Sequence, residues 1–321
     1  MKYRLIASIA AAALLSMISP VFADVDQCSR SAEMGNTDEA IKECTKQITG
    51  QSKTGNMARA YLYRGIAYQL TGRLDQAIAD FGKAAELDPK NDTAFNNRGN
   101  CYLLKGMPGQ AADDFSTAIK LNPDNDHAYF NRGVADAAAG RLDQAIDDFT
   151  RSVKLNPGNY PAFLNRGNIF IARGRVDEAI RDFSKAVEIN PGYDEAFNNR
   201  GAALMTKGQT SEAIGDFSRA IEINPKYSRA FSNRGAANMI LGRLDEADAD
   251  YARAIELNPN DASVYYNRAC LYSARKNAEE ACSWLRKAVE NGYDSWEHMK
   301  KDPDLANIRG TSCFNKIVQG K

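Results

Sequence analysis

The sequence predicts an all-α protein: a right-handed α-solenoid of helix–turn–helix repeats with degenerate capping segments at both ends. Proline recurs every 34 residues from Pro89 to Pro259, and glycine and aromatic residues recur with the same period. Between these marks the apolar residues have the 3- and 4-residue spacing of amphipathic helices. A fixed period of this length is typical of stacked repeats, because one helical pair is too small to bury its own faces.

The chain begins with a segment that has the features of a secretory signal peptide. Two basic residues precede an apolar run from Leu5 to Ile18, a Ser-Pro pair ends the run, and no acidic residue occurs before Asp24. The run is shorter than the ~20 residues that a bilayer span needs, so cleavage after Ala23 is favoured over a retained anchor. Residues 1–23 therefore predict export, to the periplasm or beyond the cell.

Seven repeats of 34 residues make up most of the remaining chain. Residues 24–57 are expected to form an N-terminal capping half-repeat, and residues 296–321 a C-terminal helical cap over the apolar face of the last repeat. The repeats cover residues 58–91, 92–125, 126–159, 160–193, 194–227, 228–261 and 262–295. We number the positions of each repeat from 1 to 34.

Each recurring residue has a physical reason to stand where it does. Gly or Ala at position 8 and Ala at position 20 let two antiparallel helices approach to ~8–9 Å. Gly at position 15 ends the first helix as a left-handed cap, and Pro at position 32 cannot continue the second. Arg at position 7 and Asp at position 23 share the period, which predicts ion pairs between the two helices. Asp136 and Asn238, both at position 11, are expected to pair with the Arg four residues earlier.

These registered positions resemble the tetratricopeptide repeat family. The resemblance rests on the aromatic residues at positions 4 and 24, the small residues at 8 and 20, and the Pro at 32. The closing segment, with Asp302-Pro303-Asp304-Leu305, is similar to that of many bacterial members. Membership implies a protein-binding scaffold, with positions 2, 5, 6, 9, 12 and 13 lining a concave groove.

Asparagine is concentrated at these groove positions, above all at position 6. An amide offers both a donor and an acceptor, which matches a peptide backbone, and the pattern resembles the asparagine-lined groove of glycosyltransferase-associated members. The alternative is that these residues belong to the family consensus and that the apolar residues between them pack between repeats. The basic residues of the chaperone-binding carboxylate clamp are absent. The candidate groove residues are Asn96, Asn97, Asn100, Asn131, Asn165, Asn168, Asn198, Asn199, Asn233 and Asn267.

The six cysteines differ in their expected roles. Cys28 and Cys44 lie on the two arms of the N-terminal hairpin, which resembles exported members, and a bridge between them is favoured. A second bridge, from Cys282 to Cys313, would join the last repeat to its cap, but the sequence leaves it open because both could be small apolar residues. The other two cysteines lie within first helices and are expected to be buried thiols.

The balance of charges and the absence of certain motifs exclude several classes of function. With 41 Lys and Arg against 41 Asp and Glu, the chain lacks the strongly basic face of a nucleic-acid protein. The sequence contains no phosphate-binding loop and no His/Cys spacing suited to a metal. A non-enzymatic scaffold of the cell envelope, without cofactor or metal, is therefore predicted to bind an extended polypeptide in its groove. The alternatives are an assembly factor that recruits folded envelope machinery through its convex face or ends, and an accessory substrate-binding subunit of an envelope enzyme.

Overall fold

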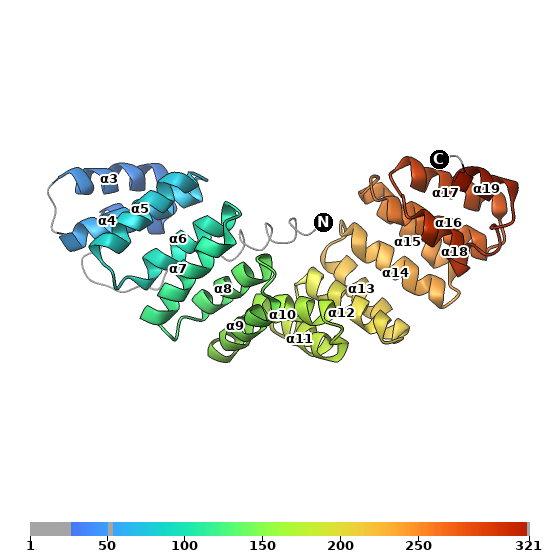
Figure 1. Cartoon of the computed structure of the whole chain (residues 1–321), viewed down its shortest axis with the longest axis horizontal. Coiled ribbons are helices and arrows are strands. Elements are labelled where there is room, and N and C mark those ends of the chain that lie inside the picture. Colours follow the sequence, from blue (N-terminus) through green and yellow to red (C-terminus); the bar gives the residue numbers. More distant parts are fainter. Residues whose placement is uncertain (1–26, 51–53, 320–321) are drawn as a thin grey trace. The chain divides into compact units, whose positions relative to one another are not determined.

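A computed structural model describes residues 27–50 and 54–319. These residues form helices joined by short turns, and they contain no strand (Figure 1). The predicted all-α solenoid of helical pairs is confirmed. The predicted signal peptide lies outside the described residues.

The chain divides into two compact units, Met1–Arg166 and Gly167–Lys321. The boundary falls inside one first helix, and in each unit first and second helices alternate along the chain. The first helices are α4 (Thr54–Leu70), α6 (Asp92–Leu104), α8 (Asp126–Ala138), α10 (Tyr160–Ala172), α12 (Asp194–Thr206), α14 (Ser228–Ile240) and α16 (Ala262–Ala274). The second helices are α5 (Leu74–Leu87), α7 (Pro108–Leu121), α9 (Leu142–Leu155), α11 (Val176–Ile189), α13 (Thr210–Ile223), α15 (Leu244–Leu257) and α17 (Ala278–Glu290).

Short helices precede and follow the repeats. α4 begins at Thr54, four residues before the expected start of the first repeat, because no proline precedes it as one precedes each later repeat. The opening segment contains α2 (Gln27–Glu33) and α3 (Thr37–Thr49), and the closing segment contains α18 (Trp296–Lys301), η2 (Pro303–Leu305) and α19 (Ser312–Gln319).

The two helices of each repeat touch at position 8. A Cβ atom added to Gly133 would lie 2.8 Å from Cε1 of Phe149, whose ring is fully buried. In the seventh repeat the position holds Ala269, and the residue opposite it is Leu285 instead of an aromatic. Glycine therefore occupies position 8 in the repeats that have an aromatic ring at position 24, because the ring fills the space of a Cβ atom. The same contact recurs at Gly65 and Phe81, Gly99 and Phe115, Gly167 and Phe183, Gly201 and Phe217, and Gly235 and Tyr251.

The turn between the two helices needs a left-handed residue. Six glycines from Gly72 to Gly242 have φ between 72° and 79°, as predicted for caps. In the seventh repeat Lys276 takes this place with φ 57°, and it is the only non-glycine with positive φ among the described residues.

Replacing Lys276 by glycine should therefore stabilise the protein. A residue with a Cβ loses roughly 1 kcal/mol or more in this conformation, which glycine does not lose. We expect Lys276→Gly to raise the free energy of unfolding by about 1 kcal/mol in urea titrations. The matched control is Lys120→Gly near the end of α7, where glycine should lower it by roughly 0.5–1 kcal/mol. Equal effects of the two changes would contradict the assignment.

Arg at position 7 joins the two helices of its repeat and touches the repeat before it. Nε and Nη2 of Arg132 donate to the two carboxylate oxygens of Asp148, both at 2.8 Å, and Nη1 donates to the hydroxyl of Ser116 at 3.1 Å. Burial raises the pKa of Asp148, and the guanidinium of Arg132 opposes this shift. The pair therefore offsets the cost of placing a carboxylate in the core. Equivalent pairs are Arg64 with Asp80, Arg98 with Asp114, Arg200 with Asp216, and Arg234 with Asp250.

The two polar residues at position 11 find other partners than the sequence suggested. Asp136 accepts a hydrogen bond from Nε of Arg141, at 2.7 Å, and not from Arg132, because Arg132 is already bound to Asp148 through two hydrogen bonds. Asn238 donates to Asp250 at 3.3 Å, which adds a donor to that carboxylate. The expectation of a local pair with the preceding Arg is wrong at both places.

The seventh repeat replaces the ion pair by an aromatic contact. Trp284 stands where the other repeats have Asp, and the guanidinium of Arg268 lies 4.0 Å from its ring centroid. Nε of Arg268 donates instead to Asp248 in the preceding repeat, at 2.6 Å. The Arg keeps a carboxylate partner although its own repeat no longer supplies one.

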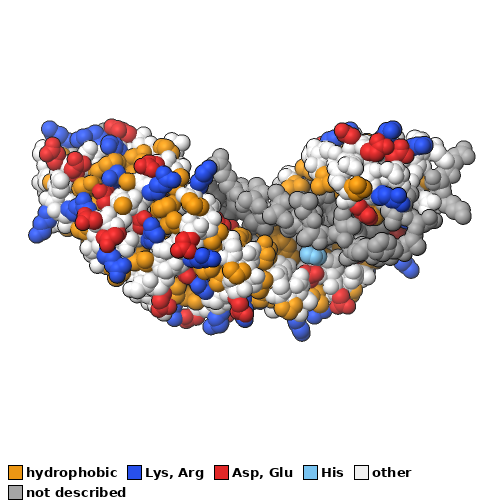
Figure 2. All heavy atoms as spheres, turned by 180° about the vertical axis from the view of Figure 1, so that it is seen from behind, with side chains coloured by type: hydrophobic (Ala, Val, Ile, Leu, Met, Phe, Trp, Pro, Cys, Tyr) orange, Lys and Arg blue, Asp and Glu red, His pale blue; other side chains and the backbone are white. Residues whose placement is uncertain are grey.

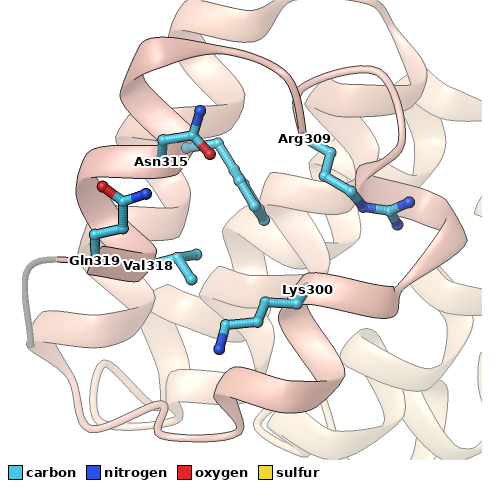
Figure 3. A pocket seen from close by; sticks show the side chains of 6 residues that line it. Lys300, Arg309, Asn315, Val318 and Gln319 are labelled. Carbon is cyan, nitrogen blue, oxygen red and sulfur yellow. The ribbon is translucent and has the colours of Figure 1, made fainter.

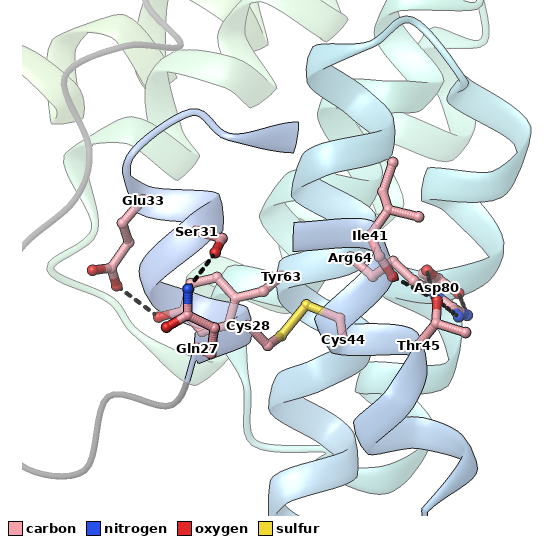
Figure 4. Close-up of a disulfide and its surroundings, with 10 residues drawn as sticks. All are labelled: Gln27, Cys28, Ser31, Glu33, Ile41, Cys44, Thr45, Tyr63, Arg64 and Asp80. Atoms are coloured by element: carbon pink, nitrogen blue, oxygen red, sulfur yellow. Dashed lines mark hydrogen bonds and ion pairs between the residues drawn. A yellow bond between two sulfur atoms is a disulfide. The ribbon is translucent and has the colours of Figure 1, made fainter. Parts of the chain in front are cut away.

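A disulfide closes the opening segment. Cys28 on α2 is joined to Cys44 on α3 at an S–S distance of 1.99 Å, and both residues are fully buried beside Ala60. Figure 4 shows the bridge between the two short helices, with the Tyr63 hydroxyl of α4 donating to Glu33 on α2. The favoured bridge is thus present, and it joins the two helices of the cap to each other.

The closing segment covers the apolar face of the last repeat. Met299, Leu305, Ile308 and Phe314 are buried in one cluster with residues of α16 and α17. A second disulfide, Cys282–Cys313, joins α17 to α19 at an S–S distance of 2.04 Å. The remaining cysteines, Cys101 and Cys270, are buried thiols, as expected.

Candidate functional site

One side of each first helix carries positions 2, 6, 9 and 13, and we call it the inner face. These positions are three or four residues apart, so they lie along one line on a helix. Positions 6 and 13 are two turns apart, which is about 10 Å along the axis. Asparagine occupies position 6 in every repeat except the first, which has Tyr63.

The position-6 amides are half-buried and bind one another across repeats. Nδ2 of Asn131 donates to Oδ1 of Asn96 in the preceding repeat, at 3.2 Å. Nδ2 of Asn233 makes the equivalent bond to Oδ1 of Asn198, at 2.9 Å. The amide row is therefore partly a structural element that joins neighbouring first helices.

Two further position-6 amides have other partners. Nδ2 of Asn199 donates to Oδ1 of Asn168, at 3.0 Å, and Asn199 accepts from Asn198. Nδ2 of Asn165 donates to the carbonyl of Pro161 in its own helix, at 2.8 Å. Within the described residues, the side-chain oxygens of Asn131, Asn165 and Asn233 accept no hydrogen bond, and the side chains of Asn97, Asn100 and Asn267 form none; all six are half-buried.

The asparagines at position 5 do not line an open face. Asn96 is 6% exposed and Asn198 is 1% exposed. The same position holds the buried side chains of Leu62, Phe130 and Leu164 in other repeats. Position 5 therefore packs between adjacent first helices, and Asn96 and Asn198 support the position-6 amides instead of meeting a ligand.

Exposed aliphatic side chains lie at the far end of the inner face. At position 13, Ile240 is 66%, Leu104 42% and Leu70 47% exposed, and Ile171 at position 12 is 40% exposed. Met239 is half-buried against the core. Leu104, Ile171, Met239 and Ile240 are among the apolar residues that lie between the groove asparagines in the sequence, and Leu70 shares position 13 with Leu104 and Ile240.

Charge is absent from most of the inner face. No Lys, Arg, Asp or Glu stands at position 5, 6, 9, 12 or 13 of any repeat, and charged residues and histidine occur only at position 2, as Arg59, His127, Glu195 and Arg229. Elsewhere on the surface, Figure 2 shows acidic and basic side chains scattered among hydrophobic ones. A ligand of the inner face is therefore not selected by a field of one sign.

The closing segment forms a hollow of about 440 Å³, lined by Lys300, Arg309, Phe314, Asn315, Val318 and Gln319. In Figure 3 the charged ends of Lys300 and Arg309 point to opposite sides of this hollow. Lys300 is paired with Glu297, and Arg309 donates to the carbonyl of Asp302. The two cations therefore do not converge on one anion, and this hollow is a weaker candidate than the inner face.

A second polar cluster joins η2 to α16. The Cys270 sulfur and one carboxylate oxygen each of Asp302 and Asp304, which are atoms that could bind a metal ion, lie within 4.8 Å of one another. The Tyr266 hydroxyl donates to Asp302, which also accepts from the Asp304 amide. Burial raises the pKa of the Cys270 thiol far above its usual range. These contacts account for the cluster as part of the closing segment.

Models of known protein families match most of the chain. Models described as "Tetratricopeptide repeat" match residues 58–91, 93–125, 127–159, 194–227, 228–261 and 251–283, and one described as "TPR repeat" matches residues 167–208. No curated protein matches the chain. Among the described helices, none has both the length and the apolar character that crossing a membrane requires.

Several solved structures share the fold. YrrB, described as "a TPR protein with an unusual peptide-binding site", is 28% identical, with a TM-score of 0.50 over 60% of this chain and 97% of its own. PilF of Pseudomonas aeruginosa is 19% identical, with a TM-score of 0.58 over 64% of this chain and 95% of its own. The C-terminal part of a TPR repeat-containing protein from Cytophaga hutchinsonii is 17% identical, with a TM-score of 0.60 over 75% of this chain and 97% of its own.

Proposed function

Because the chain belongs to the tetratricopeptide repeat family, we propose that it is a non-enzymatic protein-interaction scaffold whose inner face binds an extended polypeptide segment. The observation that carries this proposal is the row of half-buried amides at position 6 on successive first helices. In several of these side chains the amide oxygen accepts no hydrogen bond, and in others neither the oxygen nor the NH2 group forms one. Within each unit, unused hydrogen-bonding groups on successive first helices suit the regular backbone of an extended chain.

Two findings support the proposal. YrrB, which is 28% identical, is described as having a peptide-binding site. The inner face also offers exposed aliphatic side chains beside the amides, which could receive the side chains of the same segment. The function is therefore assigned to the inner face, with Asn97, Asn100, Asn131, Asn165, Asn168, Asn199, Asn233 and Asn267 as the proposed contacts.

The proposed location is the cell envelope. Residues 1–23 have the features of a signal peptide, and the two disulfides suit an oxidising compartment. N-terminal sequencing of the protein from its native cells should begin at Asp24.

A variant that leaves the bonds between repeats intact tests the binding role. Asn97, Asn100 and Asn165 make no side-chain hydrogen bond to another repeat, so changing all three to alanine should keep the melting temperature within a few degrees. Each lost hydrogen bond to a ligand costs ~0.5–1.5 kcal/mol, so the triple variant should capture the natural partner at least tenfold less well. Capture is measured by affinity purification from envelope extract, followed by mass spectrometry.

The control variant changes the second helices instead. Lys83→Glu with Lys185→Glu alters exposed residues of α5 and α11 and should leave partner capture unchanged. Unchanged capture by the triple asparagine variant, with loss in the control, would contradict the proposal. It would then favour recruitment of a folded partner by the second helices.

A further inference from the structure

On α6 and α14 the inner face carries an amide at one end, its polar side, and a large aliphatic side chain at the other end, its apolar side. On α14, Asn233 at position 6 is followed by Ala236 and then by Ile240, the most exposed of the inner-face aliphatic residues. On α6, Asn97 is followed by Asn100 and then by the exposed Leu104. The amide and the aliphatic side chain are about 10 Å apart along each helix.

The amide side is better equipped to accept hydrogen bonds than to donate them. Each side-chain NH2 group has two N–H bonds, and Asn131 and Asn233 use one of them on the preceding repeat, as Asn165 does on the Pro161 carbonyl. One N–H per side chain is left, against two unused lone pairs on each oxygen. The last assignment is unambiguous, because a backbone carbonyl can only accept. Their side-chain oxygens are therefore directed at groups that donate, such as the backbone N–H of a bound chain.

The charges nearest the apolar side stand at position 14, where carboxylate partners already hold three of them: Lys105 is paired with Asp75, Lys207 with Asp177 and Arg275 with Asp245. None of the first helices has a Lys, Arg, Asp or Glu from position 8 to position 13 except Asp136. That carboxylate is buried and bound to Arg141. A charged side chain bound here would lose hydration without gaining an ionic partner, which is unfavourable.

We propose that the inner face selects uncharged segments, whose backbone N–H groups donate to the position-6 amides while aliphatic side chains pack on the position-13 residues. This inference rests on the proposed function and defines its ligand class. Side chains of an extended chain alternate in direction, so every second residue faces the apolar side. A segment with aliphatic residues at alternate positions and no charge at those positions fits both sides.

Synthetic decapeptides test the ligand class directly. Serine alternates in each with one other residue: valine in the first, lysine in the second and glutamate in the third, all with blocked termini. We expect the full-length protein to bind the valine peptide at least tenfold more tightly than either charged peptide, by fluorescence anisotropy. Raising the salt concentration should change the valine affinity less than about twofold, because no ion pair is involved.

Two protein variants and one altered peptide complete the test. Leu70→Ser with Leu104→Ser, on the adjacent first helices α4 and α6, should weaken binding of the valine peptide about tenfold. Leu121→Ser, at an exposed leucine near the end of the second helix α7, should not. Methylation of the serine backbone nitrogens should also weaken it. The inference is wrong if a charged peptide binds as well, if no peptide binds, or if the double variant binds normally. Loss of the natural partner in the asparagine variant would still uphold the proposed function in each of these cases.

Discussion

Asp148→Ala should lower the free energy of unfolding by about 3 kcal/mol. The change leaves the guanidinium of Arg132 without its two carboxylate bonds, and removing one partner of a buried pair costs ~3–5 kcal/mol. We take the lower end because the Arg132 side chain is 26% exposed and water can reach it. The measurement is a urea titration followed by circular dichroism.

The neighbouring aspartate supplies the control for this prediction. Asp147 is exposed on the same helix, so Asp147→Ala should change stability by less than about 0.5 kcal/mol. Replacing both partners, as Arg132→Met with Asp148→Leu, should recover most of the loss, because no unpaired charge then remains. If the double variant is as unstable as Asp148→Ala, the ion pair contributes more to the free energy of unfolding than the removal of an unpaired buried charge accounts for.

Gly133→Ala should lower the free energy of unfolding by about 2 kcal/mol, although alanine is the better helix former. The added methyl group would lie 2.8 Å from the Phe149 ring, which is fully buried and cannot swing into solvent. Overpacking of this kind costs ~1–3 kcal/mol. The helix gains only roughly 0.5–1 kcal/mol from losing a glycine, so the steric term decides the sign.

The chain itself offers the rescue and the control. The seventh repeat pairs Ala269 with Leu285, so Gly133→Ala with Phe149→Leu should be more stable than Gly133→Ala alone. Gly109 on α7 has open space where its Cβ would stand, so Gly109→Ala should raise stability. The measurement is the denaturant midpoint of the three variants and of the unchanged protein. If Gly133→Ala is as stabilising as Gly109→Ala, the helices can separate at little cost.

The helical pairs and their ends could be predicted from the sequence because each signal acts within one repeat. A glycine at position 15 sets the turn through its own φ angle, and a proline at position 32 prevents the preceding second helix from continuing. The closeness of Gly133 to the ring at position 24 follows from the same 34 residues. The fold class could therefore be predicted from steric signals within one repeat, without any contact between repeats.

The candidate site depended on contacts that no single repeat contains. Positions 5 and 6 carry the same residue type in Asn198 and Asn199, yet one is 1% exposed and the other half-buried. Their difference arises from the neighbouring first helix, which covers position 5. Asp136 likewise found Arg141 because Arg132 was already bound to Asp148.

The amino-acid sequence by itself determined the repeat, its helices and its turns, because those follow from residues close together in the chain. Only the tertiary structure decided which asparagines keep unused hydrogen-bonding groups. That outcome is a competition for donors and acceptors between adjacent helices: Asn131 donates one N–H to Asn96, whereas neither the oxygen nor the NH2 group of Asn97 forms a side-chain hydrogen bond. Burial and partner choice are properties of the stacked helices, because a side chain's neighbours there come from residues about 30 or more positions away in the chain.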